Sequence, residues 1–356
     1  MFPFKKNDLF GLDIGSSSIK LAELKKTGKG YYLTKVGIAH LPPETIVEGA
    51  IMDSGALIDA IKKLVELHKP RSKNVATAVS GHSVIIKKIS LPVMSEEELE
   101  QSIQWEAEQY IPFNINEVNL DFQIVGGPAG GEAAESGQMD VLLVAAKKEL
   151  IEDYRSILAG AGLRPVVIDV ASFAIQNMYE TNYDVEEGEV VAMFNIGASS
   201  TNINIFKGGG SVFTRDIHFG GNQFNEEIQK ILHVSYQEAE FLKLGSGSAT
   251  ERQRAEVKAI TERVTEALLA EVQRSLEFFS ATSGDEKIHK VMLSGGCSSL
   301  ANFAQRVEDR LGLPVEVANP FRRIAYDESA LTAGYLEEIA PQLGVAIGLA
   351  VRRLGD

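Results

Sequence analysis

Two stretches, GLDIGSSSIKLAEL at 11–24 and MFNIGASSTNINIF at 193–206, repeat one pattern at a constant offset along the chain. Each stretch has an apolar strand, an acid or amide, a glycine, a run of serines and a second strand with alternating pattern. Internal similarity at a fixed offset indicates that a structural unit has been duplicated. Each copy predicts a β-hairpin whose tip consists of glycine and serine.

The chemistry of such a tip favours anion binding. Glycine lets backbone N–H groups approach an anion closely, and serine hydroxyls add short donors. Asp13, at the end of the first strand, offers a hard oxygen that would hold Mg²⁺ through water, and Lys20 adds a positive charge. A single copy would be an ordinary tight turn, but two facing copies would clamp a polyphosphate. The predicted contacts are Gly15, Ser16, Ser17, Ser18, Lys20, Asn195, Gly197, Ser199 and Ser200.

A third element, KVMLSGGCSSLANFAQRVEDRL at 290–311, reads as a strand, a glycine pair and a helix that starts near Ser298 or Ser299. The pair Gly295 and Gly296 lets a flat base or ribose lie against the backbone. The N-terminus of the helix would contribute donors. Both glycines and Ser298 are therefore candidate nucleotide contacts, although a plain strand-turn-helix would have the same pattern.

Composition limits the classes of protein to consider. A chain of 356 residues exceeds the length of roughly 250–300 residues at which single cores divide, so at least two domains are expected. The net charge of −14 disfavours nucleic-acid binding. The single cysteine, Cys297, excludes an internal disulfide and lacks a nearby histidine that would activate it, so we expect a packed side chain.

We find no secretory signal, no P-loop and no apolar run of about 20 residues that could span a bilayer. We therefore expect a cytoplasmic protein without direct membrane insertion. The most apolar segment, 341–351, reads as a buried core helix. Its Gly344 and Gly348 are spaced for close packing at a hinge between domains.

Two further local patterns give predictions. The segment SEEELEQSIQWEAEQY predicts a helix capped by Ser95, with Glu98 completing a capping box. Trp105 on this helix is expected in the core beside Ile103 and Tyr110; the alternative is an exposed aromatic side chain that lines a peptide groove. The glycine-rich stretch between the strands near 117–125 and 139–146 predicts a loop.

The three nucleotide elements, in this order, resemble the actin-like ATPase superfamily. Within it the chain is most similar to the PilM family of FtsA-like, cytoplasmic type IV pilus assembly proteins. This resemblance extends over nearly the whole chain, and it is carried by GLDIGSSSIKLAEL, EAEQYIPFNINEVNLDFQIV (106–125), LSGG (293–296) and NPFRR (319–323).

The resemblance implies a duplicated α/β fold of the ribonuclease H type, with two lobes around a nucleotide cleft. The first lobe would comprise 1–82 and 147–185 with a C-terminal helix at 335–356. An FtsA-type subdomain would be inserted at 83–146. The second lobe would be 186–334, including a helical part at 221–287.

The resemblance also implies ligands and partners. Gly220, Gly221, Glu240 and Lys243 would approach the nucleotide, which would be ATP or ADP with Mg²⁺. The partner would be the N-terminal cytoplasmic peptide of a PilN-type inner-membrane protein, alongside other pilus motor components. This partner would hold the chain at the inner face of the inner membrane.

Two departures from the superfamily pattern favour tight binding with slow hydrolysis. Asn195 stands where many members have Asp, so Mg²⁺ would be held less strongly there. Ala171 stands where relatives often have an acid that orients water, and Asp169 and Gln176 are only weak substitutes. Two alternatives remain open: a sugar- or acetate-type kinase of the same superfamily, and an adaptor that binds no nucleotide.

Overall fold

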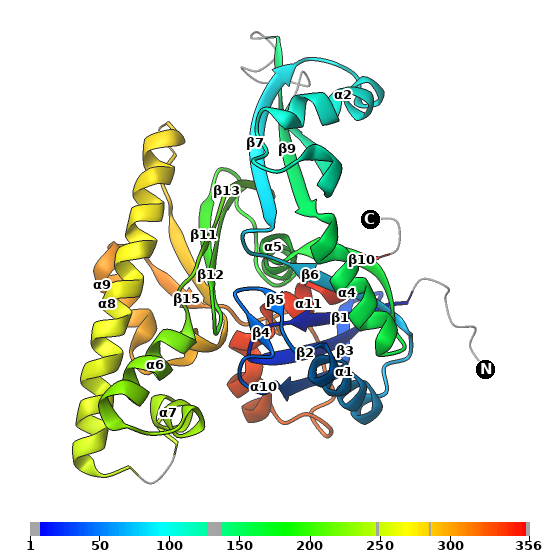
Figure 1. Cartoon of the computed structure of the whole chain (residues 1–356). Helices are drawn as coiled ribbons and strands as arrows, with labels where there is room; N and C mark the ends of the chain where they lie inside the picture. Colours follow the sequence, from blue (N-terminus) through cyan, green and yellow to red (C-terminus); the bar gives the residue numbers. More distant parts are fainter. Residues whose placement is uncertain (1–7, 127–136, 247–248, 285, 354–356) are drawn as a thin grey trace.

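The computed structural model describes residues 8–126, 137–246, 249–284 and 286–353. Two five-stranded sheets with equivalent strand order form two lobes (Figure 1). In the first lobe the order is β10-β6-β1-β2-β3, formed by β1 (Phe10–Ile14), β2 (Ser18–Thr27), β3 (Gly30–His40), β6 (Asn74–Val79) and β10 (Arg164–Val170). In the second lobe the order is β15-β14-β11-β12-β13, formed by β11 (Val190–Ile196), β12 (Thr201–Lys207), β13 (Gly210–Ile217), β14 (Lys290–Ser294) and β15 (Val315–Val317).

The two sheets repeat each other down to strand register. Asp13 on β1 lies opposite Lys20 on β2, and Asn195 on β11 lies opposite Asn202 on β12. Strands β1 and β11 also pair in parallel with β6 and β14, respectively. The predicted duplicated α/β architecture is therefore confirmed.

Helices surround both sheets. The first lobe carries a small hairpin and two outer helices, β4 (Ile46–Val47), β5 (Ala50–Ile51), α1 (Ser54–His68) and α4 (Lys148–Gly160). The helical part of the second lobe consists of α6 (Gly221–Leu232), α7 (Tyr236–Lys243) and the long α8 (Glu251–Thr282), followed after β14 by α9 (Phe303–Leu311).

Two buried helices, α5 (Ala171–Asn182) and α11 (Gly344–Ala350), lie between the lobes (Figure 1). They share one hydrophobic core with residues from both sheets, including Ala22 and Met193. A Cβ on Gly348 would overlap the carbonyl oxygen of Ala174 on α5. The predicted close packing at glycine is therefore confirmed, and it joins the two helices at the boundary between the lobes.

The C-terminal segment differs from the single helix expected at 335–356. Helix α10 (Ala333–Ile339) is followed by a 3₁₀ turn at Ala340–Gln342 and then by α11. Pro341 lies in this turn, where the absence of an N–H prevents one continuous helix. Helix α11 is buried throughout, as predicted for 341–351. Residues 354–356 lie outside the described chain.

A three-stranded antiparallel sheet forms an insert next to the lobes (Figure 1), with strands β7 (Val84–Pro92), β8 (Val118–Gly126) and β9 (Gln138–Lys147) in the order β7-β9-β8. Helix α2 (Glu96–Glu108) covers one face, and a 3₁₀ turn at Ile115–Glu117 precedes β8. The predicted capping box of Ser95 and Glu98 is present. The predicted glycine-rich loop falls mostly at 127–136, outside the described residues.

The prediction that Trp105 lies in the core is wrong, because its side chain is 74% exposed. The buried row of α2 is Leu99, Ile103 and Ala107, spaced four residues apart. At about 100° per residue, Trp105 is turned roughly 200° from Ile103 and points away from the sheet. Trp105 is close to Ile103 in sequence but lies on the opposite side of the helix.

Candidate functional site

The two predicted hairpin tips have the same turn geometry. The N–H of Gly15 donates to the carbonyl of Ser18 over 3.1 Å, and the N–H of Gly197 donates to the carbonyl of Ser200 over 2.9 Å. The tips come from different lobes and meet, because Ser16 Oγ donates to Ser199 Oγ over 3.0 Å. The fold therefore brings together two serine-rich tips that are 183 residues apart in sequence.

The tips retain unused backbone donors. Within the described chain, the N–H groups of Ser16, Ser17, Ala198 and Ser199 have no hydrogen-bond partner. Successive free N–H groups at a turn attract anions. Four such groups on two apposed tips form a candidate polyphosphate site.

The charged groups lie on the first tip. Asp13 Oδ2 and Lys20 Nζ are 3.3 Å apart, and both side chains are more than four-fifths buried. Lys20 also donates to the carbonyl of Ser18 over 3.3 Å. On the second tip the amide of Asn195 donates to Asn202 Oδ1 over 3.2 Å. A divalent cation would find one carboxylate, that of Asp13, and would complete its shell with phosphate oxygens and water.

Helix α6 begins against the second tip. The N–H groups of Gly221 and Asn222 donate to the carbonyls of Gly197 and Ala198 over 2.9 and 2.7 Å. A Cβ on Gly220 would lie 2.5 Å from the Gly197 oxygen, so only glycine allows this approach. The glycine pair at 220–221 therefore lies directly beside the second tip.

Glu240 and Lys243, on α7, lie next along the same surface. Lys243 Nζ donates to Glu240 Oε2 over 2.6 Å and reaches the carbonyl of Gly221 at 3.4 Å. Asn225 donates to the same carboxylate oxygen of Glu240 over 2.6 Å. The residues predicted from resemblance to approach the nucleotide thus form one connected group next to the second tip.

The segment after β14 departs from the prediction of a helix starting near Ser298 or Ser299. A 3₁₀ turn covers Gly296–Ser299, the chain then extends at Leu300, and α9 begins only at Phe303. Gly295 has φ +87°, and a Cβ there would overlap the backbone of Ile196. Packing against β11 therefore redirects the chain before an α-helix can form.

Within this segment Ser298 is buried and donates to the carbonyl of Gly295 over 2.7 Å. Cys297 is also buried, and its sulfur lies 3.6 Å from the carbonyl oxygen of Gly197. Burial raises the pKa of the Cys297 thiol to about 11. The thiol is therefore protonated at neutral pH and acts as a packed side chain, as predicted.

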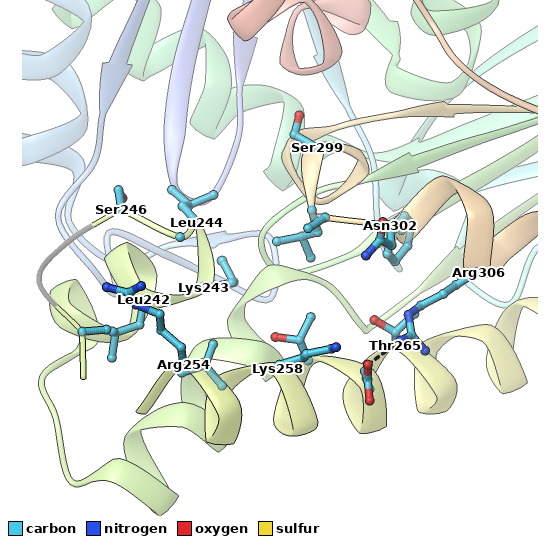
Figure 2. A pocket seen from close by; sticks show the side chains of 18 residues that line it. Leu242, Lys243, Leu244, Ser246, Arg254, Lys258, Thr265, Ser299, Asn302 and Arg306 are labelled. Carbon is cyan, nitrogen blue, oxygen red and sulfur yellow. Dashed lines mark hydrogen bonds and ion pairs between the residues drawn. The ribbon is translucent and has the colours of Figure 1, made fainter. Parts of the chain in front are cut away.

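A cavity of about 570 Å³ lies beyond Lys243 (Figure 2). Its walls come from the end of α7, one face of α8, the segment 299–302 and the first turn of α9. The lining combines apolar and charged side chains, among them Leu242, Val257, Leu300, Phe303, Lys243, Arg254, Lys258, Glu262 and Arg306. The predicted element at 290–311 supplies one wall of this cavity, whereas the wall from α8 comes from a segment that no sequence motif marks.

The two weak catalytic candidates have structural partners. Asp169 Oδ2 lies 3.3 Å from Arg352 Nε, and burial raises the pKa of the Asp169 carboxyl group. The amide of Gln176 donates to Glu180 and to the carbonyl of Gly209, both over 2.8 Å. Its oxygen accepts from Asn204 over 3.2 Å. The amide of Gln176 is therefore fully hydrogen-bonded within the protein, whereas Asp169 has an ion pair to Arg352 but no hydrogen bond to its buried Oδ2.

A contact that the sequence did not reveal also joins the lobes. Asp216 at the end of β13 accepts from Asn202 Nδ2 over 2.7 Å and from the N–H of Gly81 over 2.6 Å. A second cavity, of about 330 Å³, adjoins this contact and is lined by β7, β13 and the start of α5. The first lobe, the second lobe and the insert all contribute to this junction.

Comparison with known proteins agrees with this geometry. The family model "Type IV pilus assembly protein PilM" matches residues 11–354. The chain belongs to the PilM family. A solved structure titled "PilM-PilN type IV pilus biogenesis complex" is similar to this PilM family member at 33% identity and a TM-score of 0.85, over 97% of this chain and 98% of that one.

More distant relatives share the actin-like fold. The cell division protein FtsA of Streptococcus pneumoniae serotype 2 is 25% identical over 291 residues, which cover 74% of this chain and 62% of that protein. MreB5 of Spiroplasma citri, solved with AMPPNP, has a TM-score of 0.52 at 15% identity, over 89% of this chain and 92% of that one. Among the described residues, no helix has both the length and the apolar character needed to cross a bilayer.

Proposed function

We propose that this PilM family member binds MgATP or MgADP between its two hairpin tips. In this role it is a scaffold for pilus assembly that binds the N-terminal cytoplasmic peptide of a PilN-type inner-membrane protein. The observation that carries the proposal is the meeting of two matched tips from different lobes, through Ser16 and Ser199, with four unused N–H groups. The related PilM–PilN complex and the AMPPNP-bound MreB5 agree with it.

The phosphates would lie at the tips and the adenosine toward α7. The unused N–H groups of Ser16, Ser17, Ala198 and Ser199 would donate to phosphate oxygens. Bound Mg²⁺ would neutralise phosphate charge, and Asp13 would hold it through water. Lys20 would then exchange part of its contact with Asp13 for a contact with phosphate.

The base end of the nucleotide would enter the cavity beyond Lys243. Lys243 lines this cavity and its Nζ reaches the carbonyl of Gly221, so it connects the cavity with the second tip. Leu242 and Leu244 in the cavity wall are at least partly exposed and offer an apolar surface for a purine. Glu240, held by Asn225 and Lys243, could accept from a ribose hydroxyl.

Hydrolysis would be slow, because none of the three positions considered offers an unpaired carboxylate that could orient water. Ala171 lacks one, Asp169 is paired with Arg352, and Gln176 uses its whole amide inside the protein. Phosphate release under saturating MgATP tests this expectation. A turnover of roughly 1–100 per second, as in active kinases, would contradict it and favour the kinase alternative.

The PilN-type peptide would bind in the 330 Å³ cavity, where it would contact both lobes and the insert. Strands β7 and β13 are edge strands of their sheets, and an extended peptide can pair with a free edge. Because the walls of this cavity come from both lobes, the affinity for the peptide would depend on the angle between the lobes. This partner would hold the protein at the inner face of the membrane.

Calorimetric titration of a PilN-type N-terminal peptide, with and without MgATP, tests this coupling. We expect binding in both conditions with different affinities, and Ile86→Asp in the cavity wall should abolish it. Equal affinities would remove the coupling, and unchanged binding by Ile86→Asp would exclude this cavity as the peptide site.

A further inference from the structure

We propose that the outer face of α2 is a docking surface for a Lys- and Arg-rich segment of another polypeptide. This surface, the Trp105 face, lies opposite the buried row of α2 and is separate from the nucleotide site. It consists of the exposed residues Glu97, Gln101, Gln104, Trp105 and Glu108.

Trp105 is the first reason for the proposal. It is 74% exposed, and it forms no ring or cation contact within the described chain. Scattered apolar side chains are normal on a protein surface, but Trp is large and is enriched among the residues that dominate binding energy at interfaces. An exposed Trp at the middle of a solvent face is therefore well placed to be an anchor.

The charges of α2 are the second reason. Its sequence, EEELEQSIQWEAE, contains six glutamates and no basic residue. None of these glutamates forms an ion pair within the described chain. Glu96 and Glu97 suit the positive N-terminal end of the helix, but Glu108 lies at the negative C-terminal end, where a carboxylate is unfavourable. Helix stability does not explain Glu108, whereas attraction of a cationic partner does.

The exposed Trp105 ring and the glutamates beside it together favour a basic partner. A Lys ammonium or Arg guanidinium group over the Trp105 ring would form a cation–π contact, and Glu97 and Glu108 would attract the neighbouring cations. An acidic segment would be repelled, and a purely apolar one would leave the carboxylates without partners. The face is about 20 Å long, which matches a basic helix of a few turns.

The fluorescence of Trp105 gives a direct test, because it is the only tryptophan in the chain. A short synthetic peptide rich in Lys, Arg and Leu is titrated into the full-length protein, and a peptide with Glu in place of the basic residues is the control. We expect the basic peptide alone to cause a saturable shift of emission to shorter wavelength. Added salt should weaken this binding, because exposed charges are screened.

Variants separate this surface from general attraction to an acidic protein. By calorimetry, Trp105→Ala should weaken binding of the basic peptide by roughly tenfold or more, and Glu97→Gln with Glu108→Gln should also weaken it. Leu67→Ala is the matched control, because Leu67 is 75% exposed on α1 but lies among basic residues. It should leave affinity unchanged. The side chains of Glu97, Trp105 and Glu108 are all exposed, so these substitutions should leave the thermal unfolding temperature unchanged.

Three results would overturn the proposal. One is equal affinity of Trp105→Ala and the parent protein for the basic peptide. Another is equal binding of the acidic and basic peptides. The third is a shift of emission with protein concentration alone, because this would mean that a second copy of the chain covers the face.

Discussion

The buried thiol of Cys297 makes the stability of the folded protein depend on pH. The thiol lies between the second hairpin tip and Lys243, and burial raises the thiol pKa from its ordinary value of 9.0 to about 11. An unfolded chain would lose this proton near pH 9, whereas the native protein would keep it. The stability linked to this proton is therefore intact below about pH 9 and is lost as pH rises through about 11.

We expect the free energy of unfolding to fall between pH 9 and 11 by up to about 2–3 kcal/mol from this group alone. Comparison of denaturant unfolding for the parent protein and Cys297→Ala across this range isolates the effect, because tyrosines titrate in both proteins. A smaller fall in the variant is the expected result. Parallel curves would mean that the thiol is not protected by burial.

At the scale of elements, the contact between α5 and α11 explains why a glycine is needed at the boundary between the lobes. A Cβ at Gly348 would overlap the carbonyl oxygen of Ala174, which is backbone and cannot move aside alone. We expect Gly348→Ala to destabilise the protein by about 1–3 kcal/mol in denaturant unfolding. Gly334→Ala on α10 is the control, because a Cβ there meets nothing within 4 Å. A neutral Gly348→Ala would contradict this packing.

Elements defined by local sequence were predicted well. The two hairpin tips depend on bonds between residues three apart, as at Gly15 and Ser18, and the α2 capping box is equally local. The sequence did not predict the features that depend on tertiary packing. The chain after Gly295 turns because it meets Ile196, and the cavity beyond Lys243 forms from segments distant in sequence.

For the whole molecule, we expect nucleotide phosphates to replace the direct contact between the tips. Ser16 Oγ and Ser199 Oγ are 3.0 Å apart, close enough that two cysteines there could form a disulfide. In a Cys297→Ala background, we expect Ser16→Cys with Ser199→Cys to cross-link under mild oxidation and MgATP to slow the reaction. Each single cysteine variant is the control. A cross-linking rate that MgATP leaves unchanged would mean that the phosphates do not lie between the tips.

Calorimetric titration of MgATP measures whether the two hairpins bind a magnesium nucleotide. The parent protein should bind, Asp13→Ala should bind at least about tenfold more weakly, and Asp13→Asn, which copies the second tip, should also lose affinity. Binding that is equally tight in Asp13→Ala would contradict the assignment of Asp13 to the metal. No binding by the parent protein would contradict the clamp itself and leave an adaptor that works without nucleotide.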